Sequence, residues 1–309
     1  MDYIIIDAHS HLWLRQDTVW NGRAISPLPN GRSMFLGEER QMCPPFMIDG
    51  VNSAEIFLSN MDYAQVAAAV VTQEYIDGLQ NDYYADVMAR YADRLMCCAM
   101  PDFVGDAGHD FAAEASALLD KGFRAIAIPG HRIYNGGKRM SLNTEPFFRM
   151  FREMASRGAI LSLCLEDEAQ VAEFREVVQE LPGLKVAIGH FGMPTEPCWK
   201  EQVSLALHRN VMIESGGITW LYNSEFYPFP TAVRRIREAA DMVGMDKLMW
   251  GSDYPRTITA ITYRMSYDFI LKSAELSDGD KRAFLGDNAR LFYGFQSLAV
   301  PRYVKNMSE

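Results

Sequence analysis

Short apolar segments alternate with segments of helical periodicity along almost the whole chain of 309 residues. The apolar segments are continuous instead of alternating with polar residues, which is typical of strands buried on both faces of a parallel sheet. We expect strands at residues 4–6, 67–72, 95–101, 124–129, 159–165, 185–190, 211–215 and 247–252. We expect helices at residues 53–64, 80–92, 108–121, 145–157, 168–181, 198–208, 231–243 and 264–275. Eight strand–helix units over this length predict an α/β protein with a (β/α)8 TIM barrel, in preference to an open doubly wound sheet.

The stretch between the first strand and the first helix, residues 14–52, has no clear period and is long for a loop in a compact domain. Its aromatic residues, among them Trp20 and Phe35, favour an ordered lid. No linker or shift of composition divides the chain, so we expect a single domain over residues 1–309 with a C-terminal tail at 296–309. No glycine-rich phosphate fingerprint follows any strand, which disfavours dinucleotide binding.

The formal net charge of the chain is −10, and no run of like charge occurs in it. This balance argues against nucleic acid or an anionic membrane as the main partner, whereas local arginines can still hold a small anionic substrate. The five cysteines are odd in number and show no C-x-x-C spacing, which favours a reduced, cytoplasmic setting. The sequence shows no signal-peptide pattern and no apolar stretch of membrane-spanning length.

Polar residues suited to catalysis follow several of the predicted strands. The first strand runs into Asp7, His9 and His11, whose side chains share one side because side chains in a strand alternate with period two. His190 ends the sixth strand, and Asp253 follows the eighth. Taken singly, each is more often a hydrogen-bonded polar residue, but in a (β/α)8 barrel these strand ends meet at the C-terminal face and predict one site. The other strand ends offer Thr72, Glu74, Asp102, His131, Arg132, Cys164, Glu166, Glu214 and Ser215.

Three of the strand ends carry recognisable motifs, IDAHSHLW at the start, AIGHFGMP at the sixth strand and LMWGSDYPR at the eighth. With these motifs and the segments MDYAQVAAAVVTQ and NDYYADVMARYADRLMCCAMPDF, the chain resembles the amidohydrolase superfamily over residues 3–295. The resemblance is to the amidohydrolase-related branch, which includes small lactonases and the aminocarboxymuconate-semialdehyde decarboxylase group.

The resemblance implies a role for each matched residue. His9 and His11 would be ligands of one divalent metal ion, zinc in the first place. Asp253 would be a further ligand and the general base that takes a proton from the attacking water, and His190 would bind the substrate carbonyl or that water. A buried Asp253 needs a positive partner to stay ionised, and either the metal ion or a protonated His190 would supply it.

The chain departs from the family pattern at two strands. Its fifth strand, ILSLCLED, lacks the histidine that metal-dependent members usually carry there, and the fourth strand ends without the lysine or glutamate of binuclear members. A binuclear centre is therefore disfavoured, and Cys164, Glu166 or His190 could join a mononuclear one. The departure favours the lactonases over the decarboxylases, which use the missing histidine as a ligand. Because some lactonases work without metal, metal-independent catalysis stays open.

The substrate class follows less directly from the residues. Arg132, Arg256 and the lid arginines suit a carboxylate, and Glu166 and Trp13 are further candidates for substrate binding. The aromatic run WLYNSEFYPFP at 220–230 could wall the pocket or form the interface of a homo-oligomer. We expect a hydrolase that opens a sugar-acid or aromatic-catabolite lactone. A non-oxidative decarboxylase and a catalytically idle, ligand-binding barrel are the alternatives.

Overall fold

Eight parallel strands close into a barrel in the computed structural model, which describes residues 3–104, 109–135 and 137–307. The strands are β1 (Ile6–Ser10), β6 (Ala68–Val71), β7 (Leu95–Cys97), β8 (Ala125–Pro129), β11 (Ile160–Cys164), β12 (Lys185–Ile188), β13 (Val211–Glu214) and β14 (Leu248–Met249). They form a three-stranded sheet, β1-β6-β7, and a five-stranded sheet, β8-β11-β12-β13-β14. Two isolated parallel bridges, Ala99 with Ile126 and Ser10 with Tyr254, join the sheets at both edges. The predicted (β/α)8 barrel is confirmed.

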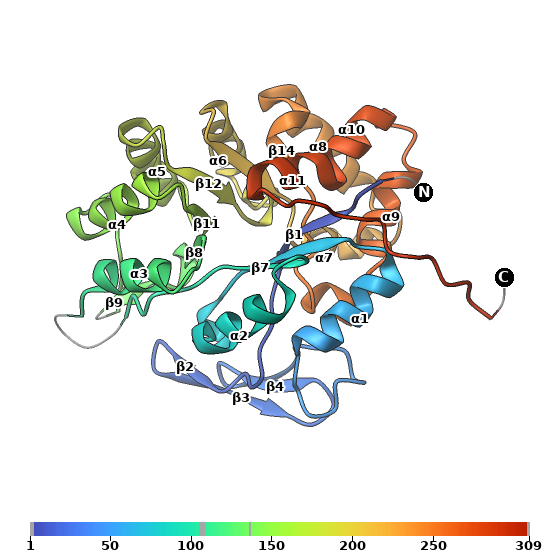
Figure 1. The fold of residues 1–309 in the computed structure, drawn as a ribbon, viewed down its shortest axis with the longest axis horizontal. Coiled ribbons are helices and arrows are strands. Elements are labelled where there is room, and N and C mark those ends of the chain that lie inside the picture. Colours follow the sequence, from blue (N-terminus) through green and yellow to red (C-terminus); the bar gives the residue numbers. More distant parts are fainter. Residues whose placement is uncertain (1–2, 105–108, 136, 308–309) are drawn as a thin grey trace.

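The helices surround the strands (Figure 1). Eight lie where helices were expected: α1 (Ala54–Ala64), α2 (Asn81–Tyr91), α3 (Phe111–Asp120), α4 (Glu145–Ser156), α5 (Glu168–Glu180), α6 (Trp199–Ser204), α8 (Pro230–Val243) and α9 (Met265–Lys272). Residue 108, the expected start of the third helix, lies outside the described residues. Three helices were not expected, α7 (Ile218–Leu221), α10 (Asp278–Arg282) and α11 (Asn288–Tyr293). A short hairpin, β9 (Tyr134–Asn135) and β10 (Lys138–Arg139), follows β8.

Several helices begin at a side chain that caps the free backbone N–H groups of the first turn. The Ser53 side chain accepts a hydrogen bond from Ile56 N at the start of α1, and the Asp167 side chain accepts one from Gln170 N at the start of α5. Ser277 forms a full capping box with Asp280 at α10. These caps fix where the strand-to-helix connections end.

Residues 14–52 contain a four-stranded antiparallel sheet, which lies beside α1 and α2 (Figure 1). Its strands are β2 (Thr18–Trp20), β3 (Arg23–Leu28), β4 (Arg32–Phe35) and β5 (Glu38–Gln41). Periodicity does not predict this sheet, because its strands are short and partly exposed. The dipeptides Asn21-Gly22 and Asn30-Gly31, each with positive φ at both residues, are the signal that indicates the hairpins.

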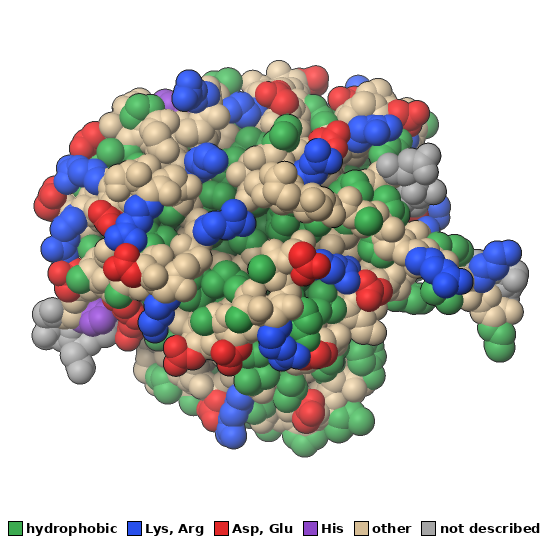
Figure 2. Space-filling model, in the orientation of Figure 1, with side chains coloured by type: hydrophobic (Ala, Val, Ile, Leu, Met, Phe, Trp, Pro, Cys, Tyr) green, Lys and Arg blue, Asp and Glu red, His purple; other side chains and the backbone are tan. Residues whose placement is uncertain are grey.

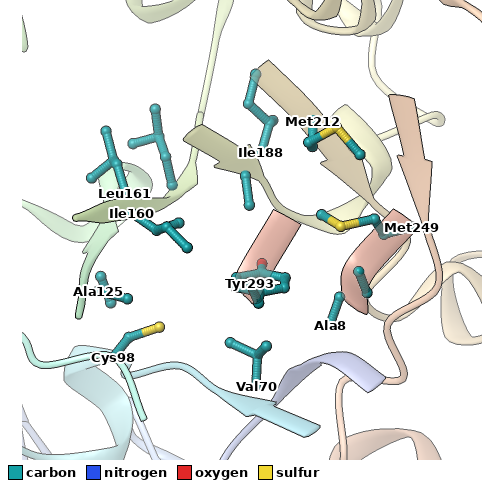
Figure 3. Packing of buried hydrophobic residues seen from close by; sticks show 14 of the residues in the cluster. Ala8, Val70, Cys98, Ala125, Ile160, Leu161, Ile188, Met212, Met249 and Tyr293 are labelled. Atoms are coloured by element: carbon teal, nitrogen blue, oxygen red, sulfur yellow. The ribbon is translucent and has the colours of Figure 1, made fainter. Parts of the chain in front are cut away.

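The barrel interior is filled with side chains. Tyr293, at the end of α11, is only 2% exposed and lies among strand residues such as Val70 and Met249 (Figure 3). Since the interior is packed in this way, a ligand can enter only at the strand ends and the loops that follow them.

An aromatic cluster joins α3 and α4 outside the barrel. The ring of Phe147 is fully buried, with centroids 4.7 Å from Phe111 and 5.8 Å from both Phe103 and Phe151. We expect Phe147→Ala to lower the free energy of unfolding by about 3–5 kcal/mol, because it leaves a cavity among these rings. Urea unfolding followed by circular dichroism measures the change. Leu291→Ala, at a side chain that is 77% exposed, is the control and should stay within about 0.5 kcal/mol of wild type. An unchanged urea midpoint for Phe147→Ala would contradict the expectation.

The surface carries mixed charge. Figure 2 shows basic and acidic side chains interspersed over one face of the molecule, without a large area of one sign. Within residues 3–104, 109–135 and 137–307, no helix combines the length and apolar character required to cross a bilayer.

Candidate active site

A cavity of about 580 Å³ opens at the C-terminal ends of the barrel strands. His9, His11, His190 and Asp253 all line it, as the sequence predicts. The expected lid, residues 14–52, and the aromatic run 220–230 also contribute lining side chains, namely Phe35, Arg40, Met42 and Trp220. The topology of the barrel thus brings together residues that are up to 244 positions apart in the chain, from His9 to Asp253.

His9, His11 and Asp253 form the centre of the site. The Nε2 atoms of the two histidines are 3.1 Å apart, and Asp253 Oδ1 lies 3.1 Å from His11 Nε2 and 3.7 Å from His9 Nε2. His9 lies on β1 and His11 directly follows its last residue, so the alternation of side chains along this extended segment puts both imidazoles on one face. Asp253 N donates a hydrogen bond to His9 O at 2.8 Å, which holds the carboxylate beside them. All three side chains are buried.

Two further carboxylates lie behind the imidazoles. Glu214 Oε1 lies 2.6 Å from His9 Nδ1, and Glu214 Oε2 accepts a hydrogen bond from Gly216 N at 2.6 Å. Asp77 Oδ2 lies 3.2 Å from His11 Nδ1, although the two atoms are not aligned for a hydrogen bond. In a neutral imidazole, a carboxylate at Nδ1 favours the tautomer with its proton there, which leaves the Nε2 lone pair available to a metal ion.

Three glycines leave the space that His9 and Glu214 occupy. A Cβ at Gly216 would lie 2.7 Å from His9 Cγ, and one at Gly251 would lie 2.8 Å from His9 Cβ. A Cβ at Gly189 would lie 2.8 Å from Glu214 Oε1. These distances are too short for any side chain, so the glycines of the AIGH, ESGG and MWGSD segments are required by the close packing around the site.

The charges of the central residues differ because their neighbours differ. Burial raises the pKa of Asp253, but the contact with His11 and the charge on Arg256 outweigh burial and hold that pKa below its ordinary range. Burial lowers the pKa of His9, but Glu214 and Asp253 raise it overall to about 9. In the absence of a bound cation, Asp253 is therefore ionised and His9 is protonated near neutral pH.

His190 lies beside His9, with ring centroids 4.7 Å apart, in a turn whose residues His190 and Phe191 both have positive φ. Burial and the charge on His9 lower the pKa of His190 to about 4, so its ring is neutral. The expectation that a protonated His190 could partner Asp253 is wrong for this reason. His190 Nδ1 lies 2.9 Å from Gly216 O, which can only accept. His190 Nδ1 therefore carries the proton, and Nε2 is an acceptor.

Arginines and acids share one wall of the cavity. Arg132 Nε lies 3.1 Å from Glu74 Oε1, and His131 Nε2 lies 3.1 Å from Glu74 Oε2. Burial raises the pKa of Glu74, but Arg132 and His131 lower it well below its ordinary range. Arg256 Nη2 donates to Asp77 Oδ1 at 2.7 Å, whereas its buried Nη1 has no hydrogen-bond partner among the described residues. That unpaired donor favours an oxygen-bearing ligand in the cavity.

The remaining predicted site residues differ in their placement. Glu166 lines the cavity and accepts a hydrogen bond from Tyr134 Oη at 3.2 Å. Trp13 is fully buried, and its Nε1 donates to Gly50 O at 2.8 Å. The Arg256 guanidinium lies over the Trp13 ring at 5.8 Å, so Trp13 supports that arginine from behind instead of contacting substrate. The prediction of direct substrate binding by Trp13 is corrected accordingly.

Two functional contacts were not predicted. Asp77 follows β6 on a short 3-10 turn, Tyr75–Asp77, where no periodic pattern indicates a role. Trp220 begins the aromatic run that was expected to wall the pocket or form an interface, but its Nε1 donates a hydrogen bond to Asp253 Oδ2 at 2.8 Å. An acidic residue in the loop that follows a buried strand is a usable signal for Asp77. The sequence contains no signal for the contact of Trp220.

The central residues fit a divalent metal ion. One ligand atom from each of His9, His11 and Asp253 lies within 4.8 Å of the others, and two imidazole nitrogens with a carboxylate oxygen suit zinc. Asp253 Oδ1 is buried and has no aligned hydrogen bond to any described residue, as expected of an atom that awaits a cation. Cys164 lines the cavity, but it does not belong to this group of described residues.

Comparison with known proteins gives a match to the family model described as Amidohydrolase over residues 6–295. A probable 2-pyrone-4,6-dicarboxylic acid hydrolase from Acinetobacter baumannii, solved with citric acid bound, is 18% identical with a TM-score of 0.67 and covers 94% of this chain and 99% of its own. A zinc-bound amidohydrolase from Burkholderia multivorans is 15% identical with a TM-score of 0.67 and the same coverage. The 5-carboxyvanillate decarboxylase of Sphingomonas paucimobilis is 15% identical with a TM-score of 0.59 over 82% of this chain and 86% of its own. At these identities the three structures show a shared fold.

Proposed function

This chain belongs to the Amidohydrolase family, and from that premise we propose that it is a metal-assisted hydrolase that opens the ring of a lactone. The observation that carries the proposal is the meeting of His9 Nε2, His11 Nε2 and the unpaired Asp253 Oδ1 at the floor of a cavity large enough for a small substrate. His9, His11 and Asp253 would hold the metal ion. When bound, the ion would act as a Lewis acid toward the lactone carbonyl.

The chain's own residues account for the proton transfers. Asp253 accepts a proton from water as the water oxygen bonds to the carbonyl carbon. The bond between that carbon and the ring oxygen then breaks, and Asp253 returns the proton to the ring oxygen to give a hydroxy acid. His190 Nε2, as an acceptor, can hold the second hydrogen of the water, which favours the water over the carbonyl as its partner.

An anionic substrate is part of the proposal. Arg132 and Arg256 line the cavity, and a guanidinium binds a carboxylate through two hydrogen bonds. A protein of the same fold, the probable pyrone dicarboxylic acid hydrolase, was solved with citric acid bound. Substrates of this kind include carboxylated pyrones and sugar-acid lactones.

A substrate panel tests the function. Sugar lactones, pyrone carboxylates and carboxylated phenols are each incubated with the protein, with and without added Zn²⁺ or Mn²⁺. Proton release with ring opening supports a lactonase. Release of carbon dioxide from a carboxylated phenol would replace the proposal with a non-oxidative decarboxylase. One protein of this fold is a 5-carboxyvanillate decarboxylase. Ligand binding without turnover in the whole panel would contradict both enzymes.

The role of Arg132 is testable with two substrates of different charge. We expect Arg132→Gln to raise KM for a carboxylated lactone by about tenfold or more, because it removes a charge-assisted hydrogen bond, and to change KM for a neutral lactone much less. Steady-state kinetics on both substrates measures the difference. Arg149→Gln, at an exposed surface arginine, is the matched control. Equal changes of KM for both lactones would rule out a contact between Arg132 and the carboxylate.

A further inference from the structure

Trp220 reaches the site because of the backbone that precedes it. It lies on α7, directly after β13, and Gly217 at the start of this helix has a φ of 75°. The indole folds back across Gly217 so closely that a Cβ at that position would overlap the Nε1 and Cε2 atoms of Trp220. The absence of a side chain at position 217 is therefore a condition for the indole to point into the cavity.

The two oxygens of the Asp253 carboxylate have different surroundings. Oδ1 faces His11 Nε2 at 3.1 Å, His9 Nε2 at 3.7 Å and Arg256 Nη1 at 3.7 Å. Oδ2 accepts the hydrogen bond from Trp220 Nε1 at 2.8 Å. The backbone of Asp253 lies in the left-handed region at a φ of 60°, and the hydrogen bond from the indole restricts rotation of its side chain.

We propose that Trp220 is a positioning residue, which orients Asp253 so that Oδ1 alone faces the histidines and the attacking water. An indole N–H only donates and does not titrate in the physiological range. It can therefore hold Oδ2 without taking up or supplying the proton that Asp253 transfers. The Trp220 ring also packs edge-on against His190, with centroids 5.9 Å apart, so one side chain supports both groups that handle the water. This inference rests on the proposed function only for the identity of the reaction.

Kinetics separates positioning from substrate contact. Trp220→Phe keeps an aromatic ring and removes the N–H, and we expect kcat to fall by about tenfold to a hundredfold while KM stays within about threefold, because a misplaced catalytic group costs rate more than binding. Gly217→Ala keeps the tryptophan but displaces the indole, and it should lower kcat in the same way. Phe226→Leu removes an exposed aromatic ring from the same segment and should leave kcat unchanged. A rise in KM with unchanged kcat in Trp220→Phe would overturn the proposal in favour of substrate stacking.

A spectroscopic measurement tests the contact without any substrate. The chain has five tryptophans, and the indole N–H resonance of Trp220 is the one missing from the NMR spectrum of ¹⁵N-tryptophan-labelled Trp220→Phe protein. In the wild type we expect this resonance downfield, and Asp253→Ala should move it upfield and leave the indoles outside the cavity in place. A Trp220 resonance that Asp253→Ala does not move would overturn the proposal. If no lactone is turned over, the proposed function fails, while the NMR result still decides the role of Trp220.

Discussion

Replacement of Asp253 by asparagine is expected to lower kcat by about a hundredfold or more, the usual scale for the loss of a general base. Asparagine keeps the shape of the side chain and can still accept the hydrogen bond from Trp220. It cannot take up the proton of the attacking water at neutral pH, because the amide oxygen is a very weak base. The reduction should therefore fall on kcat, whereas KM changes much less.

The measurement is steady-state kinetics of the folded Asp253→Asn protein on a substrate found in the panel, with metal content determined alongside. Asp241→Asn, at an exposed carboxylate on α8, is the matched control and should keep wild-type kcat. Near wild-type turnover in Asp253→Asn would exclude Asp253 as the base. If the variant loses both its metal and its activity, the loss of activity can come from either role of Asp253, as ligand or as base. Kinetics at saturating metal separates the two roles.

Glu214→Gln is expected to weaken metal binding by about tenfold to a hundredfold, the range seen when an outer-shell partner of a histidine ligand is lost. The Glu214 carboxylate faces two donors at once, His9 Nδ1 and Gly216 N, each at 2.6 Å. An amide has one acceptor oxygen, so its NH₂ group must face one of these donors. If it faces His9, the imidazole proton moves to Nε2, and the lone pair that would bind the ion is lost.

Zinc affinity is measured by competition with a chelator of known affinity, and kcat is measured at limiting and at saturating zinc. Activity at limiting zinc should fall with the affinity and recover in part when zinc is raised. Glu168→Gln, at an exposed carboxylate in the first turn of α5, is the control. A Glu214→Gln protein that binds zinc as tightly as the wild type would show that Glu214 does not orient His9.

The barrel could be predicted because its physical signature is local. A parallel strand covered by helices on its outer face reads as a continuous apolar segment, so each of the eight strands is visible in a few residues of sequence. The ends of the segments are less certain. The expected strand 247–252 is reduced to Leu248–Met249, because the residues after it bridge to β1 at Tyr254 instead of continuing the ladder. Local sequence indicates which residues are buried, but it does not indicate where the hydrogen-bonded pairing of two strands ends.

The site could be predicted only where its residues follow from the topology of the barrel. His9, His11, His190 and Asp253 follow strands, and strand ends converge in any barrel of this type. Glu214 was one of two candidates at its strand end, and its contact with His9 spans 205 positions of sequence. The sheet within residues 14–52 and the contact of Trp220 depend on how loops pack over the mouth, for which periodicity contains no information. Residues that hold the catalytic groups in place are thus harder to predict than the groups themselves.

The closure of the barrel has a consequence for the energetics of ligand binding. Between β14 and β1 there is no regular ladder. Three isolated backbone hydrogen bonds join the two sides of this seam: Ala8 N donates to Trp250 O, His11 N to Tyr254 O and Asp253 N to His9 O. The central residues straddle this seam, because His9 and His11 belong to one side and Asp253 to the other. A ligand that binds all three residues therefore links the two sides of the barrel wall. At a concentration of a hundred times Kd, such a ligand adds about 2.7 kcal/mol to the stability of the folded state. Because the ligand binds only where both sides of the seam are in place, its removal lowers the stability of the folded state by the same amount.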